Sequence, residues 1–440
     1  MMLRASVDAA LVRPAQRASG RVQVPGDKSI SHRYALLGAI ATGTTRIAGY
    51  SSGADCAATL ACLRALGVPI VSSAGGTVEI HGRGLHGLSE APEPVDAANS
   101  GTTMRLLAGL AAAHPFRTVV VGDASLSRRP MRRVMAPLTE MGATIQSADG
   151  RPPLTIDGAP LRGITYRPDV PSAQVKSSVL LAGLHASGRT VVIEPAATRD
   201  HTERALSAFG VAVDRDGLQV SVEGGQTLTG RTVKVPGDIS GAAFWGALAA
   251  ATPGSVIHIE GVGLNPSRTA LLDILRRAGA TVEVTVEHED ANEPIGRVTI
   301  ACATPRSFTI APDEVPAVID ELPALGALGA LLPEGSTMEV RGAAELRVKE
   351  SDRISALARG FRAMGADITE YPDGFRIDAR PLHGNATVDA ANDHRLAMAF
   401  AIAACGASAP TTIAGAGAVD VSYPGFFLEL ERLTTPGDGR

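Results

Sequence analysis

Hydroxyl and cationic side chains gather behind a Pro-Gly turn in the stretch VPGDKSISHR, residues 24–33. The apolar residues after the turn recur at helical spacing, at Ile30, Tyr34, Leu37 and Ala41. Asp27 is a residue type that caps helices, so Lys28, Ser29 and Arg33 are predicted to lie in or just before the first helical turn. Free backbone N–H groups, a hydroxyl, an ammonium and a guanidinium would then converge, which suits an anion. A capped surface helix with two solvated cations fits this motif equally well.

The element that must position these groups occurs several times along the chain. Residues 20–49 (GRVQVPGDKSISHRYALLGAIATGTTRIAG) and 230–261 (GRTVKVPGDISGAAFWGALAAATPGSVIHIEG) are two copies of one strand–turn–helix–strand pattern. Looser copies begin near Val95, Arg167, Thr309 and Thr387. A second helix with a glycine at its end and a β-rich stretch follow in most copies. Each copy therefore reads β-α-β-α-β-β, and six copies predict two domains of three.

The repeats provide an internal comparison for the first motif. Aligning copies one and four superposes PGD at 25–27 on PGD at 236–238. Lys28 then faces Ile239, and Arg33 faces Phe244. A fold that accepts Ile and Phe at these places does not need cations there, so Lys28 and Arg33 are interpreted as ligand groups.

Other predicted helix starts in the first half also carry groups suited to anions. Copy two has NSGTT at 99–103, where Gly101 lets a ligand approach the backbone closely; a plain capping turn fits equally well. The packed arginines of SLSRRPMRR at 125–133 suit a carboxylate or phosphate, or a solvated loop. Copy three opens its helices with the polar residues Ser172, Gln174, Lys176, Arg199, Asp200 and His201.

Acidic side chains enter at the helix starts of the second half. Asp320 and Glu321 stand just before Pro323, a residue type found at the first turn of a helix. An acid pair that stabilises the helix dipole is the plain alternative. Cations and acids are then interleaved at Lys349, Glu350, Arg353, Asp393, His394 and Arg395.

Composition excludes several classes of protein. The chain has 440 residues, a net charge of −4 and 3% aromatic residues, which does not fit a basic, aromatic nucleic-acid surface. Its four cysteines form no C-x-x-C pair, so we expect a reduced cytoplasmic protein without a metal site. The apolar stretches are too short to span a membrane, and the N-terminus lacks the apolar core of a secretory signal.

Eight motifs together resemble the 5-enolpyruvylshikimate-3-phosphate synthase family. They occur in order across nearly the whole chain: PGDKSISHR, NSGTTMR, the RRP step, SAQVKS, RDHTER, VIDELPAL, RVKESDR and NDHRLAM. The resemblance implies transfer of the enolpyruvyl group of phosphoenolpyruvate to the 5-hydroxyl of shikimate 3-phosphate, without a cofactor. It implies an α/β fold, a two-domain inside-out barrel in which each domain holds three βαβαββ repeats. The implied domains are residues 25–236 and residues 1–24 plus 237–440, with the active site in the cleft between them.

The resemblance also implies site residues. The implied shikimate 3-phosphate ligands are Lys28, Ser29, Arg33, Ser172, Ala173, Gln174, Arg199, Asp320 and Lys349. The implied phosphoenolpyruvate ligands are Lys28, Asn99, Gly101, Arg129, Gln174, Glu350, Arg353 and Arg395. Asp320 is expected near the reacting hydroxyl, with Glu350 and Lys28 handling protons at carbon and the leaving phosphate. One departure is Val421, where some family members carry a lysine.

Two other functions stay open at this point. One is UDP-N-acetylglucosamine 1-carboxyvinyltransferase, which has the same architecture but usually Lys-Asn where this chain has Lys28-Ser29, and a cysteine in the loop that here spans residues 123–129. The other is a non-catalytic anion-binding protein on the same scaffold, which would keep the arginines but not need Asp320 and Glu350 as acids. The expected partners are small-molecule substrates only, and the expected assembly is a monomer.

Overall fold

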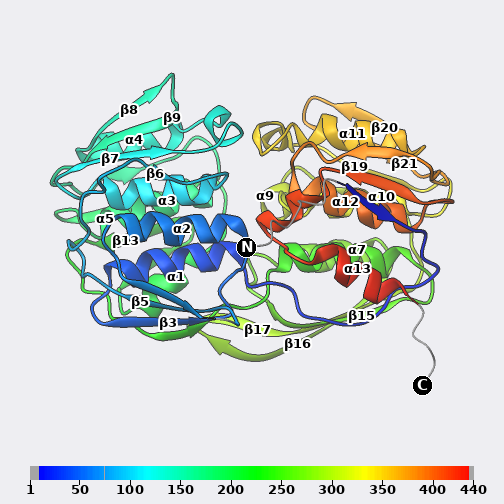
Figure 1. The fold of residues 1–440 in the computed structure, drawn as a ribbon, viewed down its shortest axis with the longest axis horizontal. Helices are drawn as coiled ribbons and strands as arrows, with labels where there is room; N and C mark the ends of the chain where they lie inside the picture. Colours follow the sequence, from blue (N-terminus) through cyan, green and yellow to red (C-terminus); the bar gives the residue numbers. More distant parts are fainter. Residues whose placement is uncertain (1–8, 74, 436–440) are drawn as a thin grey trace, which may run out of the picture. The chain divides into compact units, whose positions relative to one another are not determined.

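The computed structural model describes residues 9–73 and 75–435, which form two compact units. The N-half unit comprises residues 26–236 and 289–293. The C-half unit comprises the described residues up to 25, residues 237–288 and the described residues from 294 onward. Each unit is built from three copies of the repeat, with apolar helices inside and sheets outside (Figure 1). The predicted architecture is confirmed.

Three four-stranded sheets surround the N-half unit. The first sheet contains, in order, β14 (Thr232–Lys234), β3 (Thr44–Ala48), β5 (Thr77–His81) and β4 (Ile70–Ser73). The second contains β6 (Val95–Asp96), β7 (Arg117–Val121), β9 (Arg151–Asp157) and β8 (Thr144–Ala148). The third contains β10 (Thr165–Tyr166), β11 (Arg189–Ile193), β13 (Gln219–Glu223) and β12 (Val213–Asp216). In each sheet the first two strands are parallel and the others antiparallel, as a βαβαββ repeat requires.

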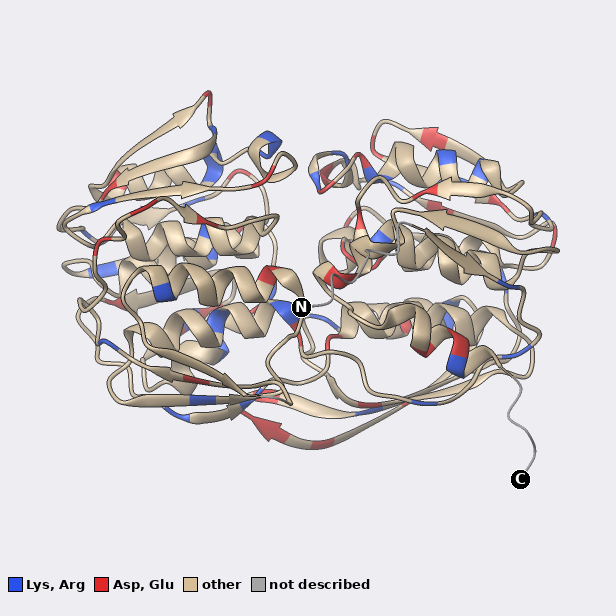
Figure 2. Cartoon of the chain, in the orientation of Figure 1, with Lys and Arg blue, Asp and Glu red and all other residues tan. Residues whose placement is uncertain are grey.

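Three helices of the N-half unit are buried along most of their length. They are α1 (Lys28–Ile40), α3 (Gly101–Ala111) and α5 (Ala173–Gly183). Their small and apolar residues face neighbours on every side, which is the pattern of a fully buried helix. The partly exposed elements are α2 (Ala54–Ala65), η1 (Leu126–Arg128), α4 (Arg132–Met141) and α6 (His201–Ala208). Figure 2 shows the buried helices largely free of charged residues.

The C-half unit repeats this plan. One sheet contains, in order, β16 (Ala280–Asp290), β17 (Glu293–Cys302), β15 (Val256–Gly263) and β2 (Ser19–Val22). Another contains β18 (Phe308–Ile310), β19 (Thr337–Val340), β21 (Gly374–Asp378) and β20 (Asp367–Tyr371). A three-stranded sheet contains β1 (Ala9–Val12), β23 (Thr411–Ala414) and β22 (Thr387–Asp389). The buried helices are α7 (Ile239–Ala251), α10 (Leu322–Ala330) and α12 (His394–Cys405). The remaining elements are α8 (Ala270–Arg277), α9 (Val315–Val318), η2 (Ala344–Val348), α11 (Arg353–Ala363), η3 (Ala416–Val421) and α13 (Phe426–Thr434).

Copies one and four exchange their leading strands. β2 precedes the helix of copy one but pairs in parallel with β15 of copy four. β14 precedes the helix of copy four but pairs in parallel with β3 of copy one. The sixth copy departs from the repeat, because β1 pairs antiparallel with β23 where the other sheets have a hairpin strand.

The tip of the β16–β17 hairpin, residues 289–293, packs in the N-half unit although both strands belong mostly to the other. The boundaries that the resemblance implies place this tip in the domain of residues 1–24 plus 237–440. The physical reason for the difference is polar: the Glu293 carboxylate accepts a bond at 2.7 Å from buried His201, and the carbonyl of Asn292 accepts from Arg204. Within the described ranges, no helix is long and apolar enough to cross a membrane.

Three histidine rings meet edge to face in the N-half unit, away from the motifs above. The His185 ring lies with its centroid 5.3 Å from those of both His86 and His114. Neither ring nitrogen of His185 has a hydrogen-bond partner among the described residues. Burial, followed by the two neighbouring imidazoles, lowers the pKa of His185 to about 3. Burial also lowers the pKa of His114.

His185 should therefore make the protein sensitive to acid. A histidine whose folded pKa is depressed binds its proton more readily in the unfolded chain, so stability is lost as pH falls below about 6.5. At pH 5.5 the expected loss from His185 is on the order of 1 kcal/mol. Urea unfolding of His185→Leu should show a shallower decline between pH 7 and 5 than the parent protein. Parallel declines in the two proteins would exclude this role.

Candidate active site

The helix start of copy one is held by a cap and a tight turn. The Asp27 carboxylate accepts from the backbone N–H of Ile30 at 2.9 Å, which satisfies one of the free groups at the start of α1. Gly26 lies against the backbone of Gly49, since a Cβ at Gly26 would stand 1.9 Å from the Gly49 carbonyl oxygen. The predicted cap and turn are thus present, and they place Lys28 at the first position of α1.

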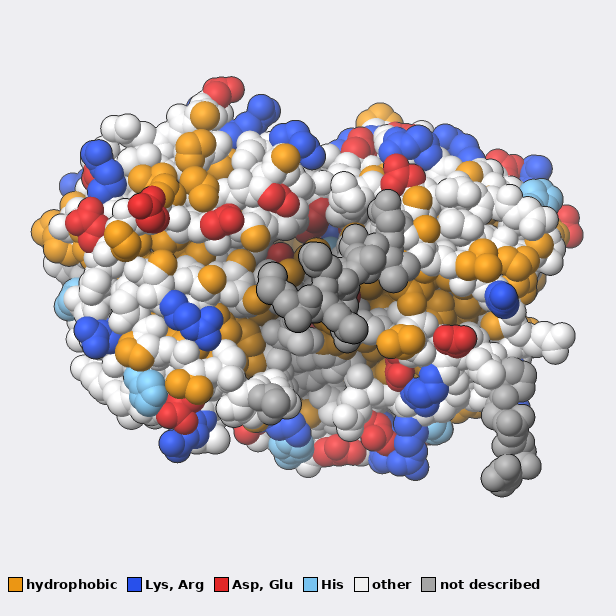
Figure 3. Space-filling model, in the orientation of Figure 1, with side chains coloured by type: hydrophobic (Ala, Val, Ile, Leu, Met, Phe, Trp, Pro, Cys, Tyr) orange, Lys and Arg blue, Asp and Glu red, His pale blue; other side chains and the backbone are white. Residues whose placement is uncertain are grey.

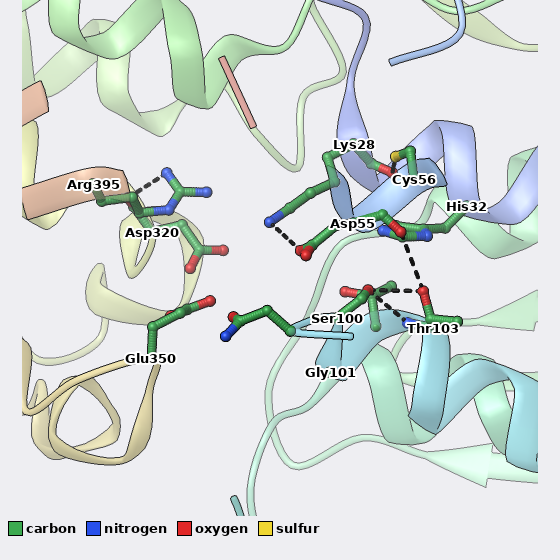
Figure 4. Close-up of polar contacts among 12 residues, drawn as sticks. Lys28, His32, Asp55, Cys56, Ser100, Gly101, Thr103, Asp320, Glu350 and Arg395 are labelled. Atoms are coloured by element: carbon green, nitrogen blue, oxygen red, sulfur yellow. Dashed lines mark hydrogen bonds and ion pairs between the residues drawn. The ribbon is translucent and has the colours of Figure 1, made fainter. Parts of the chain in front are cut away.

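Lys28 forms an ion pair at this helix start. Its Nζ lies 3.0 Å from Oδ2 of Asp55 on α2, and its side chain keeps 14% exposure (Figure 4). Asp55 also connects this point to copy two, because its carbonyl oxygen accepts from the Thr103 hydroxyl at 3.4 Å. Asp55 was not among the site residues predicted from the sequence. The feature that could have indicated it is an acidic residue in the first turn of the second helix.

Arg33 forms hydrogen bonds that hold the same helix start in place. Its guanidinium donates to the hydroxyls of Thr202 and Ser177, both at 2.7 Å, and to the carbonyl oxygen of Ser29 at 2.8 Å. Burial lowers the pKa of Arg33 to about 10, although the Glu203 and Asp27 carboxylates oppose the shift. Arg33 therefore ties α1 to α5 and α6, and its direct contact with a substrate stays a prediction.

The start of α3 carries a second cation. The Ser100 hydroxyl caps the helix by accepting from the N–H of Thr103 at 3.1 Å. Arg129, which is almost buried, donates to Oδ1 of Asn99 at 2.7 Å. Asn99 donates in turn to Asp123 at 2.7 Å. The two predicted ligands Asn99 and Arg129 thus lie in contact.

The start of α5 adds Gln174 and a cation that sequence reasoning passed over. Arg105 Nη1 donates to Oε1 of Gln174 at 2.8 Å, and Gln174 donates to the Thr102 hydroxyl at 2.9 Å. A Cβ on Gly101 would lie 2.7 Å from Nη1 of Arg105 and 3.2 Å from Nη1 of Arg129. The missing side chain lets both guanidiniums approach one point. The sequence could have indicated Arg105 as a site residue, because it stands four residues after Gly101 in NSGTTMR and so lies on the same face of the helix.

Ser172, Ala173 and Arg199 complete the predicted set in this unit. The Ser172 hydroxyl caps α5 by accepting from Val175 at 3.4 Å, and Ala173 is the first helical residue. Arg199 is half-buried just before α6. Asp200 holds the N-cap position of α6, where its carboxylate pairs with Arg204 at 3.0 Å. Gln174 thus joins the start of α5 to α3, and Arg33 joins α1 to α5 through Ser177.

The acids lie in the C-half unit, at the starts of α10 and α11. Lys349 Nζ is 3.6 Å from Oδ1 of Asp320. The carbonyl oxygen of Asp320 accepts from Arg395 Nη1 at 2.7 Å, so the backbone before α10 is bonded to the start of α12 (Figure 4). Two of the predicted cations, Lys349 and Arg395, therefore contact the residue predicted to act on the substrate hydroxyl.

Arg353 gathers three carboxylates. Its Nη2 lies 2.6 Å from Glu350, its Nε lies 2.7 Å from Asp393, and its Nη1 lies 3.8 Å from Asp320. Burial pulls the pKa of Arg353 down, but Asp393 and the other carboxylates outweigh it, so the pKa ends above its usual value. The guanidinium stays charged and holds Glu350 and Asp320 in one cluster.

Asp393 has a second role that the sequence did not indicate. As predicted, it caps α12 by accepting from the N–H of Arg395 at 3.0 Å. The same fully buried carboxylate also fixes Arg353. In the described part of the chain, no group of three or more His, Cys, Asp or Glu side chains is arranged to hold a metal.

Comparison with known proteins identifies the class of this arrangement. The EPSP synthase family (3-phosphoshikimate 1-carboxyvinyltransferase) matches residues 12–430. The 3-phosphoshikimate 1-carboxyvinyltransferase of Halorhodospira halophila is 51% identical over 424 residues, 96% of this chain and 95% of the relative. That of Acidithiobacillus ferrooxidans is 50% identical over 416 residues, 94% of this chain and 95% of the relative.

Solved structures agree. An EPSP synthase from Acinetobacter baumannii superposes with a TM-score of 0.86 at 44% identity, covering 97% of this chain and 98% of that one. The enolpyruvyl transferase NikO from Streptomyces tendae shares the fold, with a TM-score of 0.77 at 20% identity over 97% of each chain. The fold is that of the enolpyruvyl transferases. Within that class, the chain belongs to the EPSP synthase family.

The repeat comparison gives a direct test of Lys28. Lys28→Ile copies the residue of copy four, so the fold should remain while activity falls by at least ~10²-fold, the scale of losing a proton-transferring group. The substitution also removes the ammonium from Asp55. The double variant Lys28→Ile/Asp55→Ser removes that buried charge as well and should recover the melting temperature without recovering activity. An active double variant would show that Lys28 is scaffold.

Proposed function

We propose that this chain transfers the enolpyruvyl group of phosphoenolpyruvate to the 5-hydroxyl of shikimate 3-phosphate, giving 5-enolpyruvylshikimate 3-phosphate and phosphate. The observation that carries the proposal is the pairing of each predicted acid with a predicted phosphate-binding cation: Asp320 with Lys349, and Glu350 with Arg353. The relatives at about 50% identity carry the name of this enzyme.

In the proposed reaction the hydroxyl oxygen bonds to C2 of phosphoenolpyruvate while C3 takes up a proton. The C2–O bond to phosphate then breaks, phosphate leaves, and C3 loses a proton to restore the double bond. Asp320 takes the hydroxyl proton, and Glu350 and Lys28 serve C3 and the leaving phosphate. No cofactor enters this scheme, since it consists of proton transfers, an addition to a double bond and an elimination of phosphate.

The two anions require many positive groups, and the proposal divides them by substrate. Shikimate 3-phosphate is held by Lys28, Ser29, Arg33, Ser172, Ala173, Gln174, Arg199, Asp320 and Lys349. Phosphoenolpyruvate is held by Lys28, Asn99, Gly101, Arg129, Gln174, Glu350, Arg353 and Arg395. Arg105 joins the second set, because it contacts Gln174 beside Gly101. Holding both anions against their repulsion is the main task of these cations.

The alternatives receive less support. The names of the relatives do not favour UDP-N-acetylglucosamine 1-carboxyvinyltransferase, and residues 123–129 contain no cysteine. A non-catalytic anion-binding protein would not need Glu350 fixed at 2.6 Å from a buried guanidinium.

The proposed partners are these two small molecules alone. On the face drawn in Figure 3, acidic and basic side chains are interspersed on each unit, unlike the basic stripe that nucleic acid requires. We further propose a cytoplasmic monomer, in line with the four free cysteines.

Phosphate release tests the proposed function directly. The parent protein should release phosphate only when both substrates are present. Asp320→Asn and Glu350→Gln keep the shape of each side chain but remove its charge, so kcat should fall by about 10²–10⁴-fold while KM changes far less. Near-normal turnover of either variant would remove that residue from the proton transfers.

We also propose that the site residues of the N-half unit and those of the C-half unit act on the same substrate pair, which requires the two units to close around it. The support is chemical: the proposed acids lie in one unit, whereas most proposed phosphate ligands lie in the other. Small-angle X-ray scattering should show a smaller radius of gyration with shikimate 3-phosphate. Lys28→Ile serves as the control, and an unchanged profile in the parent protein would contradict closure.

A further inference from the structure

A buried charge cluster that has no place in the proposed chemistry lies next to Asp320. Glu321 is the N-cap residue of α10 and has 0% exposure. Its Oε1 accepts from Arg268 Nη2 at 2.8 Å and from the Ser240 hydroxyl at the start of α7. Arg268 also donates to that hydroxyl at 2.7 Å. These three side chains close a triangle inside the C-half unit, which we call the Glu321 triad.

The repeats explain where the triad lies. Ser240 is the copy-four counterpart of Ser29, and Asp238 caps α7 by accepting from Ser240 N–H at 2.8 Å. Copy one has Lys28 at this helix start, where it pairs with Asp55 and is proposed to bind a substrate anion, whereas copy four has Ile239 there. The place near the helix start is instead filled by an internal anion, the Glu321 carboxylate.

Stability alone gives little reason for a buried charge pair. Removing both ions from water costs several kcal/mol, and replacing such a pair by apolar residues of similar volume is often neutral or stabilising. The triad therefore calls for another role. Its geometry suggests one, because Glu321 adjoins Asp320 in the short segment between α9, which ends at Val318, and α10, which begins at Leu322.

We propose that Glu321 is a positioning residue for Asp320 and Arg395, an inference that rests on the proposed function. Anchoring Glu321 to α7 and Arg268 fixes the segment between α9 and α10. That segment presents the Asp320 carboxylate 3.6 Å from Lys349 and 3.8 Å from Arg353. It also presents the Asp320 carbonyl oxygen that holds Arg395 at 2.7 Å. A displacement of about 1 Å at such a site can cost about 10²-fold in rate.

The test separates positioning from stability with the double variant Glu321→Leu/Arg268→Met, which removes both charges and keeps the volume. Its melting temperature should stay close to that of the parent, while kcat falls by about 10²-fold and KM for shikimate 3-phosphate changes far less. Glu321→Gln keeps the acceptor oxygen for Arg268 and Ser240 and should recover most of kcat. Ile300→Val, a core variant in the same unit, controls for mild destabilisation and should keep parental kcat.

A folded double variant with parental kcat would overturn the proposal. Its crystal structure gives a second readout that does not depend on the reaction: Asp320 should have moved away from Lys349 and Arg353, and an unmoved carboxylate would also overturn it. If the double variant does not fold, Ser240→Ala is measured in its place, with kcat expected to fall about tenfold and parental kcat counting against positioning. A parent protein that releases no phosphate would contradict the proposed function instead.

Discussion

The structure depends on one constraint: the buried helices are apolar on nearly every side, so the caps, cations and acids of the candidate site gather where these helices begin. The first-turn N–H groups of each helix need acceptors there. Asp27, Ser100 and Ser172 supply them in the N-half unit, and Asp238 and Asp393 do so in the C-half unit. Each unit therefore concentrates caps, cations and acids at the helix starts.

The cations at these helix starts are already held by protein acceptors. Lys28 is paired with Asp55, Arg353 with Glu350 and Asp393, and Arg129 with Asn99. Such contacts fix long side chains before a ligand arrives, which lowers the entropy lost on binding. They also keep carboxylates beside the cations that are proposed to bind phosphate, so in the proposed function proton transfer and anion binding use the same cluster.

Much of the fold and site could be predicted because both follow local rules. The caps at Asp27 and Asp393 and the helices behind them follow from residue type and apolar spacing. The exchange of β2 and β14 could not be found this way. Both strands precede nearly the same PGD turn, so alternation and propensity fit either sheet equally well.

The side chains that were not predicted from the sequence are those whose importance comes from contacts between separate elements of the fold. Asp55 belongs to the site because it forms an ion pair with Lys28, and Arg105 belongs to it because it donates a hydrogen bond to Gln174. Glu321 reads as an ordinary dipole-stabilising acid until Arg268 and Ser240 are seen beside it. No spacing within one helix or strand carries that information, since each partner lies in another element.

The central claim is that cations of one unit and acids of the other serve one pair of substrates. A crystal structure of Asp320→Asn with shikimate 3-phosphate and phosphoenolpyruvate tests it most directly, since slowed turnover should retain both ligands. The account predicts contacts to the phosphoenolpyruvate phosphate from Lys28 or Arg129 in one unit and from Arg353 or Arg395 in the other. Ligands held by one unit alone, with the other unit's residues remote, would contradict it.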